Sequence, residues 1–187
     1  MATLLILAPY GVFATLMLVS SAAVSLFAAA AVCLLVIAHD ALCGRSVKML
    51  GAGSAILFAG LGAYLALTGH LWSSSAVKFA VDAGILAITL VSLAIGKPFT
   101  LQYAREMTDA RTAQLPDFLT ANYVITSAWA LAIALMMTAN ALVIYMPGLP
   151  LWTGLAVALA ARTTAIYFTR WYPEYRKAKS AAPAGIL

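Results

Sequence analysis

The chain has 187 residues, of which 64% are hydrophobic and 9% charged, and its formal net charge is +5. A soluble domain carries roughly 25% charged residues, so this composition excludes a water-soluble fold. The apolar residues form long uninterrupted runs, and the basic residues stand at the ends of these runs, where membrane topology and anionic lipid explain them better than nucleic acid does. We therefore expect an all-α, polytopic transmembrane bundle that binds no nucleic acid.

Apolar runs follow one another from the amino terminus onward. A helix needs about 20 apolar residues to cross a hydrocarbon core of roughly 30 Å. The first run, residues 3–38, is too long for one crossing and divides at Ser20 and Ser21. We expect six spans in one domain of residues 1–170: 3–19, 22–38, 49–68, 77–96, 118–145 and 151–169. A single tilted helix over residues 3–38 would give five spans instead.

The distribution of Lys and Arg predicts the orientation of these spans. With six spans, nine basic residues fall on one side, in the connections 39–48 and 97–117 and in the tail, against Lys78 alone on the other. Basic connections stay in the cytoplasm. We therefore expect a multi-pass protein of a bacterial-type inner membrane, with both termini and the tail, residues 171–187, in the cytoplasm.

Polar side chains lie at helical spacing inside the fourth expected span. Asp82 follows Lys78 by one turn, so the two can form an ion pair. Acidic residues within a membrane often mark a route for ions or protons. Asp82 is also near enough to the interface, roughly 7 Å along the helix, to be paired and hydrated without such a role. Both interpretations stay open.

The sixth expected span contains Arg162, whose insertion near the centre of a span costs roughly 2.5–3.5 kcal/mol. Gly154 and Ala158 precede it at four-residue steps, and small residues mark the side of a helix that packs closely. We therefore expect Arg162 to face the bundle and to contact Asn122, which lies at a similar depth. An Arg that reaches along lipid to the cytoplasmic surface is the alternative.

A polar stripe also runs along the fifth expected span, where Asn122, Trp129 and Asn140 share one face. An unpaired amide in lipid is costly, so each Asn needs a partner inside the bundle. The stripe fits either helix packing or the lining of a ligand path.

The connection between the fourth and fifth spans predicts a short interfacial helix over about residues 98–112. Phe99, Tyr103 and Met107 repeat every four residues on one face, while Arg105 and Glu106 lie elsewhere. A solvated loop with scattered aromatic residues is the alternative. In the tail, interface aromatic residues alternate with basic ones, each of which gains about 1 kcal/mol near anionic lipid.

The sequence contains no pattern typical of an active site. His39 and His70 are expected at opposite surfaces, and Cys33 and Cys43 lack the spacing of metal ligands. No nucleophile motif or phosphate loop is present. We expect no catalytic residue, no metal and no cofactor, and hence a protein that is not an enzyme.

Residues over most of the chain have counterparts, in the same order, in a known family. They are Pro9, the basic connection 45–48, Gly60 and Gly62 leading to His70 and Lys78, Lys97-Pro98, Leu115-Pro116, Trp129-Ala130 followed by Asn140, Pro147, and Ile166-Tyr167-Phe168-Thr169-Arg170. In these positions the chain resembles the intracellular septation protein A family of small inner-membrane proteins. The sixth span is shorter here, and Arg162 has no counterpart in that family. The resemblance implies an envelope protein linked with cell division and elongation.

Two functions remain as hypotheses. The first is a non-enzymatic role in envelope maintenance or cell division, through contacts with membrane proteins or lipids, with a homo-oligomer left open. The second is a small permease or channel with a polar path through spans four to six, along Asp82, Asn140, Trp129, Asn122 and Arg162. A contact protein would have these groups bonded to one another in a dry bundle, whereas a permease would have a hydrated cavity among those spans.

Overall fold

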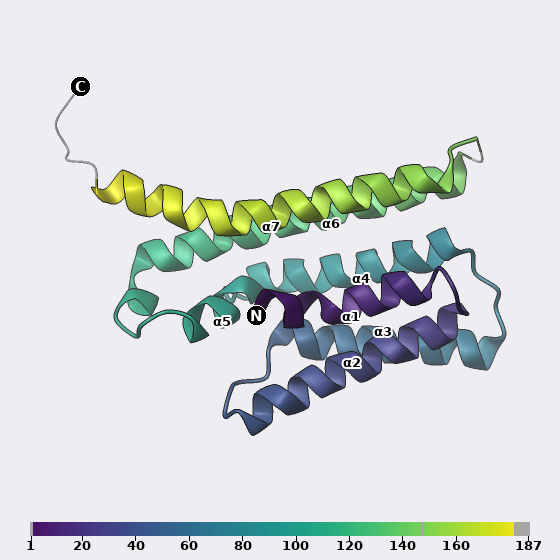
Figure 1. Ribbon diagram of the computed structural model, residues 1–187, viewed down its shortest axis with the longest axis horizontal. Coiled ribbons are helices and arrows are strands. Elements are labelled where there is room, and N and C mark those ends of the chain that lie inside the picture. The colour runs from purple at the N-terminus through teal and green to yellow at the C-terminus, as the bar shows by residue number, and fades with distance from the viewer. Residues whose placement is uncertain (1, 147, 182–187) are drawn as a thin grey trace.

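The computed structural model describes residues 2–146 and 148–181, and these residues form helices joined by short connections (Figure 1). In chain order the elements are α1 (Ala2–Leu16), α2 (Ala22–Leu42), α3 (Met49–Thr68), α4 (Ser74–Ala94), α5 (Phe99–Glu106), the 3-10 turn η1 (Thr112–Gln114), α6 (Pro116–Tyr145) and α7 (Leu151–Ala181). The expected all-α fold is confirmed. Pro147, within the expected turn between the last two spans, lies outside the described residues.

Four of the described helices are long and apolar enough to cross a membrane: α2, α3, α4 and α6. Six spans were expected, and the other two coincide with α1 and the first part of α7. However, α1 has only 15 residues, and α7 carries Arg162 within its apolar part. The protein is therefore a multi-pass helical membrane protein with four helices that meet the requirements of a complete crossing.

Local signals in the sequence explain where the helices begin and end. Ser21 and Ser73 accept hydrogen bonds from the backbone N–H groups of Val24 and Ala76, at 3.3 and 3.2 Å, and so cap α2 and α4. The cap at Ser21 is the reason that residues 3–38 form two helices rather than the single tilted helix considered above. Gly69 ends α3 with a φ of 65°, a conformation that glycine adopts without steric cost.

The helices run back and forth, so that consecutive connections lie at alternate ends of the bundle (Figure 1). Each helix packs against the next: α1 on α2, α2 on α3, α3 on α4, α4 on α6 and α6 on α7. The amino terminus, the α2–α3 connection, α5 and the end of α7 lie at one end, which we call the basic end. It carries the nine basic residues counted above, whereas Lys78 belongs to the part of α4 near the other end.

The helix expected over residues 98–112 is shorter than predicted, because α5 ends at Glu106. The carboxylate of Asp109 accepts a hydrogen bond from the Thr112 N–H at 2.9 Å, and this bond holds the pKa of Asp109 below its usual value. Asp and Thr side chains often bond to nearby backbone in this way and compete with the helix. Phe99 and Tyr103 pack against the bundle as expected, but Met107 is exposed.

The expected tail, residues 171–187, does not begin where a helix ends. Instead, α7 continues past Arg170 and through Pro173 to Ala181. Its end is held against the start of α6 by an ion pair between Arg176 and Asp117, whose N–O distance is 3.0 Å. Residues 182–187 of the expected tail lie outside the described residues.

Candidate functional site

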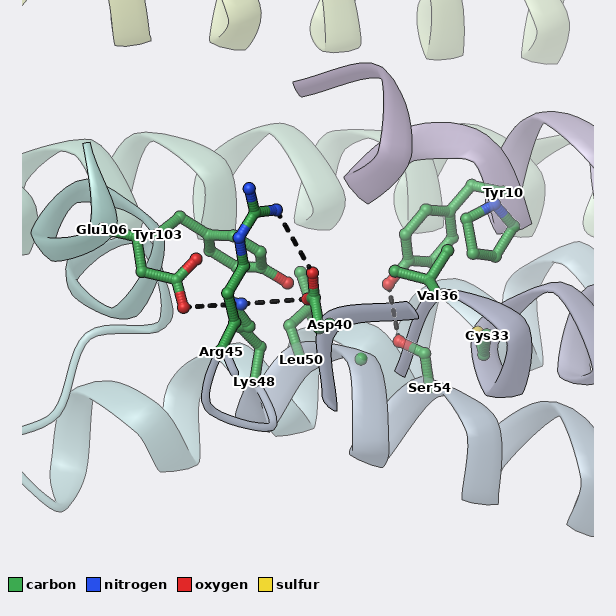
Figure 2. Close-up of a pocket in the computed structure, with 12 residues that line it drawn as sticks. Tyr10, Cys33, Val36, Asp40, Arg45, Lys48, Leu50, Ser54, Tyr103 and Glu106 are labelled. Atoms are coloured by element: carbon green, nitrogen blue, oxygen red, sulfur yellow. Dashed lines mark hydrogen bonds and ion pairs between the residues drawn. The ribbon is translucent and has the colours of Figure 1, made fainter. Parts of the chain in front are cut away.

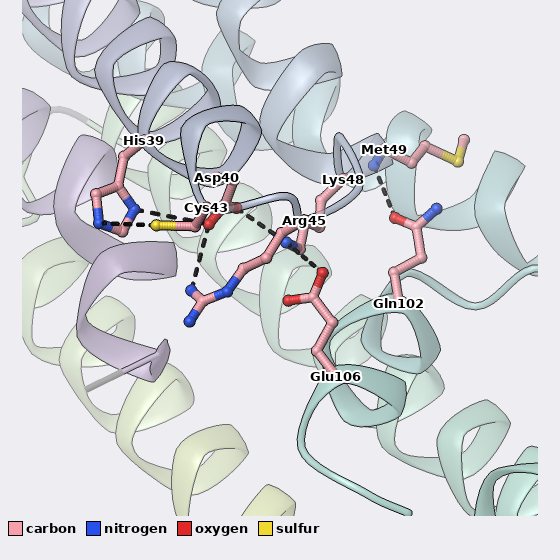
Figure 3. Close-up of polar contacts among 8 residues, drawn as sticks. All are labelled: His39, Asp40, Cys43, Arg45, Lys48, Met49, Gln102 and Glu106. Atoms are coloured by element: carbon pink, nitrogen blue, oxygen red, sulfur yellow. Dashed lines mark hydrogen bonds and ion pairs between the residues drawn. The ribbon is translucent and has the colours of Figure 1, made fainter. Parts of the chain in front are cut away.

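The most concentrated set of polar contacts in the described residues surrounds a buried lysine at the basic end (Figure 3). Lys48 is only 4% exposed. Its Nζ donates hydrogen bonds to Asp40 Oδ2 at 2.9 Å and to Glu106 Oε1 at 2.7 Å. Asp40 belongs to α2 and Glu106 to α5, so one ammonium group joins two helices that are far apart in sequence. We call Asp40, Lys48 and Glu106 the lysine clamp.

The connection between α2 and α3 places Lys48 in this position. Gly44 adopts a φ of 69°, and the N–H of Arg45 donates to the carbonyl of Asp40 at 2.8 Å, which turns the chain back beneath α2. The guanidinium of Arg45 lies 3.5 Å from Asp40 Oδ1. Lys48 then stands as the extended residue directly before α3 and points inward.

Helix α5 makes three further contacts around the clamp, with α3, with Lys48 and with α4. Gln102 Oε1 accepts a hydrogen bond from the Met49 N–H at 2.7 Å, and so caps the first turn of α3 (Figure 3). The ring of Tyr103 lies 5.9 Å from Lys48 Nζ, within the range of a cation–π contact. At the beginning of α5, the Phe99 N–H donates to Ser92 Oγ at 3.2 Å, which fixes α5 to the end of α4.

The electrostatics of the clamp explain how a charged lysine is tolerated out of water. Burial alone disfavours the ammonium form, but the hydrogen bonds and charges of Glu106 and Asp40 outweigh it and raise the pKa of Lys48. Burial also raises the pKa of the Tyr103 hydroxyl, and the nearby carboxylates of Asp40 and Glu106 act in the same direction. Lys48 is therefore charged and Tyr103 neutral at physiological pH.

A cavity of about 50 Å³ adjoins the clamp (Figure 2). Its polar lining consists of the clamp together with Tyr10, Cys33, Arg45, Ser54 and Tyr103, and its apolar lining of Pro9, Val36, Leu50 and Gly51. At the inner end the hydroxyl groups of Tyr10 and Ser54 form a hydrogen bond of 2.6 Å. The cavity therefore extends from the ion pairs of the basic end to a polar contact between α1 and α3.

A second polar cluster lies between α4 and α6. Asn140 Nδ2 donates to Asp82 Oδ2 at 2.8 Å, and both side chains are buried. The expected ion pair between Lys78 and Asp82 is replaced by this bond, and the charges of Arg162 and Lys78 act on Asp82 only through space. Gly154 of α7 packs close to Asn140, so the cluster lies where α4, α6 and α7 meet.

The expected contact between Arg162 and Asn122 is wrong. Asn122 Nδ2 donates instead to the carbonyl of Phe118, one turn earlier in α6, at 2.9 Å. An Asn side chain can reach the carbonyl four residues earlier in its own helix, so Asn122 needs no partner on another helix for its amide N–H. Arg162 is half-buried, and its neighbours Ala158, Ala161 and Ala165 on α7 pack into the core of the bundle.

The other predicted residues lie on α5 and α6. Trp129 Nε1 donates to Thr169 Oγ1 at 2.9 Å and joins α6 to α7. Tyr103 and Glu106 belong to the site at the basic end, whereas Arg105 is exposed beside it. Sequence reasoning missed the partners Asp40, Lys48 and Gln102. In the sequence, these three residues are an acid, a base and an amide near the ends of apolar runs. Lys48 was used only to predict the orientation of the spans.

The arrangement consists of ion pairs and hydrogen bonds that join side chains of different helices. No group of three or more His, Cys, Asp or Glu side chains in the described residues is placed to hold a metal ion. The fold and the site together define a multi-pass α-helical membrane protein with ion-paired and hydrogen-bonded side chains between its helices. Comparison of the chain with family models, with curated proteins and with solved structures finds no match.

Proposed function

We propose that the chain is a six-span protein of a bacterial-type inner membrane with a non-enzymatic role in envelope maintenance or cell division. It acts through contacts with other membrane proteins or with anionic lipid. In this proposal α1 and α7 cross the membrane together with α2, α3, α4 and α6, and the basic end faces the cytoplasm. The resemblance to the septation protein A family supports the division role.

The contact role is supported mainly by the hydrogen bonding of the polar side chains inside the bundle. Among the described residues, every buried side-chain nitrogen or oxygen has a hydrogen-bond partner. Asp82 and Asn140, which a permease would need along its path, bond to each other. The cavity described above lies among α1, α2, α3 and α5 rather than among the fourth, fifth and sixth expected spans. These features favour a contact protein over a permease.

Complementation of a strain lacking the gene tests this proposal. We expect the deletion to change cell length or septum frequency, and the wild-type gene to restore both. Asp82→Asn keeps the size and the polarity of the side chain but removes its ionisable group. A contact protein should therefore function normally with Asp82→Asn, whereas a permease that moves protons or cations past this carboxylate should lose activity.

A flux measurement separates the two functions without a phenotype. Purified protein in liposomes containing a pH-sensitive dye should give the same proton and potassium leak as empty liposomes. A leak that depends on the protein and disappears in Asp82→Asn would favour the permease and contradict the proposal.

A further inference from the structure

The cavity at the basic end has the size and the lining of a water site. A cavity needs roughly 10–15 Å³ of this volume to hold one water molecule, so about 50 Å³ is room for more than one. The hydroxyl of Tyr103 faces this space and makes no hydrogen bond within the described residues (Figure 2). Asp40, Tyr10 and Ser54 supply further polar atoms around the same volume.

Helix α5 closes this space with its carboxyl-terminal half. Tyr103 and Glu106 line the cavity, and Lys48 fixes Glu106 to the α2–α3 connection. The amino-terminal half is anchored differently, because Phe99 and Leu101 are buried in the bundle at 5% and 4% exposure. The amino-terminal half of this eight-residue helix is therefore held by packing and by polar bonds to α3, α4 and α6, and the carboxyl-terminal half by the Lys48–Glu106 ion pair and by the packing of Tyr103.

The chain directly beyond α5 does not extend the helix. Residues 107–111 form no regular helix, and Met107 is 73% exposed. Loss of the bonds to Glu106 and Gln102 would release the carboxyl-terminal end of α5 from the α2–α3 connection, while the bonds of Thr100 to the Asn122 carbonyl and to Thr126 keep its beginning on α6. The segment therefore combines an end anchored on α6, an end held by polar bonds and by the packing of Tyr103, and a cavity beneath it.

We propose that the cavity is a water-binding vestibule and that α5 is its lid, held closed by the ion pair between Lys48 and Glu106. When the lid opens, solutes from the basic end reach Cys33 and the Tyr10–Ser54 hydrogen bond in the interior of the bundle. This inference does not depend on the division role, since it concerns only how water enters the protein.

Cys33 is a natural reporter of this opening, because it lines the cavity and is only 2% exposed. The test uses full-length protein in nanodiscs with Cys43→Ser, which removes the exposed thiol. The reagent is a sulfonated methanethiosulfonate, whose charge prevents entry through lipid. We expect Glu106→Ala to raise the labelling rate of Cys33 by about tenfold or more, because every 1.4 kcal/mol lost from the closed state is tenfold in the open population.

Arg105→Ala is the matched control, since Arg105 is the neighbouring residue, is exposed and forms no ion pair within the described residues. Its labelling rate should stay within about twofold of the parent, because exposed charges contribute little. A second reporter separates a lid from general unfolding: Ala29→Cys, in a Cys33→Ser and Cys43→Ser background, places a thiol at a position that is 0% exposed. It should stay protected in Glu106→Ala. Equal rates for the two Ala variants, rapid labelling of Cys33 in the parent, or exposure of both reporters would each overturn the proposal.

Discussion

At the scale of single residues, the lysine clamp sets the cost of burying a charge against the attraction of two carboxylates. Lys48 loses nearly all its contact with water, and two carboxylates replace its hydration with hydrogen bonds of 2.9 and 2.7 Å. A buried ion pair contributes little net stability as a whole, because desolvation offsets the attraction, but removal of one member leaves the others uncompensated. If Lys48 is removed, Asp40 still has the guanidinium of Arg45 beside it, whereas Glu106 loses its ion-pair partner.

Lys48→Met is therefore expected to destabilise the protein by about 3 kcal/mol or more, because it leaves the carboxylates of Asp40 and Glu106 together without their shared cation. Denaturant titration of the purified protein in detergent would measure this loss. Lys97→Met serves as the control, since Lys97 is exposed at the same end of the bundle. A loss no larger than that of the control would show that the clamp adds no stability.

The same clamp makes stability depend on pH. The pKa of Lys48 is raised in the folded protein, so its contribution is fully present below the unfolded pKa of roughly 10.4. It is lost as pH rises through the folded pKa. Stability should therefore fall at alkaline pH in the wild type and fall less in Lys48→Met, with Tyr103, whose pKa is also raised, adding the remaining decline in both.

Sequence reasoning identified Asp82 and Asn140 as candidates because they lie on polar stripes within expected spans, and Glu106 because it belongs to the expected interfacial helix. It could not identify their partners. Lys48 meets Glu106 only because α5 folds back beneath the α2–α3 connection, and no periodicity in the chain records that approach. The partner of Asn122 could not be predicted either, since a hydrogen bond to a carbonyl of its own helix serves its amide as well as a bond to a distant side chain would.

At the scale of helices, close packing depends on glycines that face a neighbouring helix. A methyl group at Gly62 of α3 would lie 3.3 Å from Leu26 Cβ and from the ring of Phe27, both on α2. At Gly60, two residues earlier, it would meet nothing within 4 Å. Small residues at such positions allow membrane helices to approach each other.

Gly62→Leu should consequently separate α2 from α3 and destabilise the protein by about 1–3 kcal/mol, the usual cost of overpacking. Gly60→Leu should be neutral or stabilising by up to about 1 kcal/mol, because glycine is a poor helix former and the position is open. Thermal unfolding of both variants in one detergent measures the difference. Similar losses in the two variants would contradict the close approach of α2 and α3.

The positions of the long helices could be predicted because apolar runs and turn residues mark them directly. The limits of α5 and α7 could not. Asp109 ends the helical region early through a local bond, and α7 continues as a helix through Pro173, beside the start of α6, where Arg176 pairs with Asp117. A change from apolar to basic composition marks a membrane boundary but not the end of a helix.

At the scale of the whole molecule, the proposed orientation predicts which residues meet each aqueous phase. In a Cys33→Ser and Cys43→Ser background, an impermeant maleimide should label Leu71→Cys on intact cells, because Leu71 is fully exposed in the α3–α4 connection. Arg45→Cys, Arg105→Cys and Lys177→Cys should react only after the inner membrane is opened. Labelling of Arg105→Cys on intact cells would reverse the proposed topology.

The lengths of α6 and α7 have a mechanical consequence. Their 30 and 31 residues correspond to about 45 Å of helix, whereas the hydrocarbon core is roughly 30 Å thick. Both helices extend past the others at the basic end, where Arg176 and Asp117 join them (Figure 1). In the proposed topology, in which both helices cross the membrane, about 15 Å of the pair extends past the hydrocarbon core as an arm joined by this ion pair. A partner bound at its tip would be held at a fixed distance from the membrane surface.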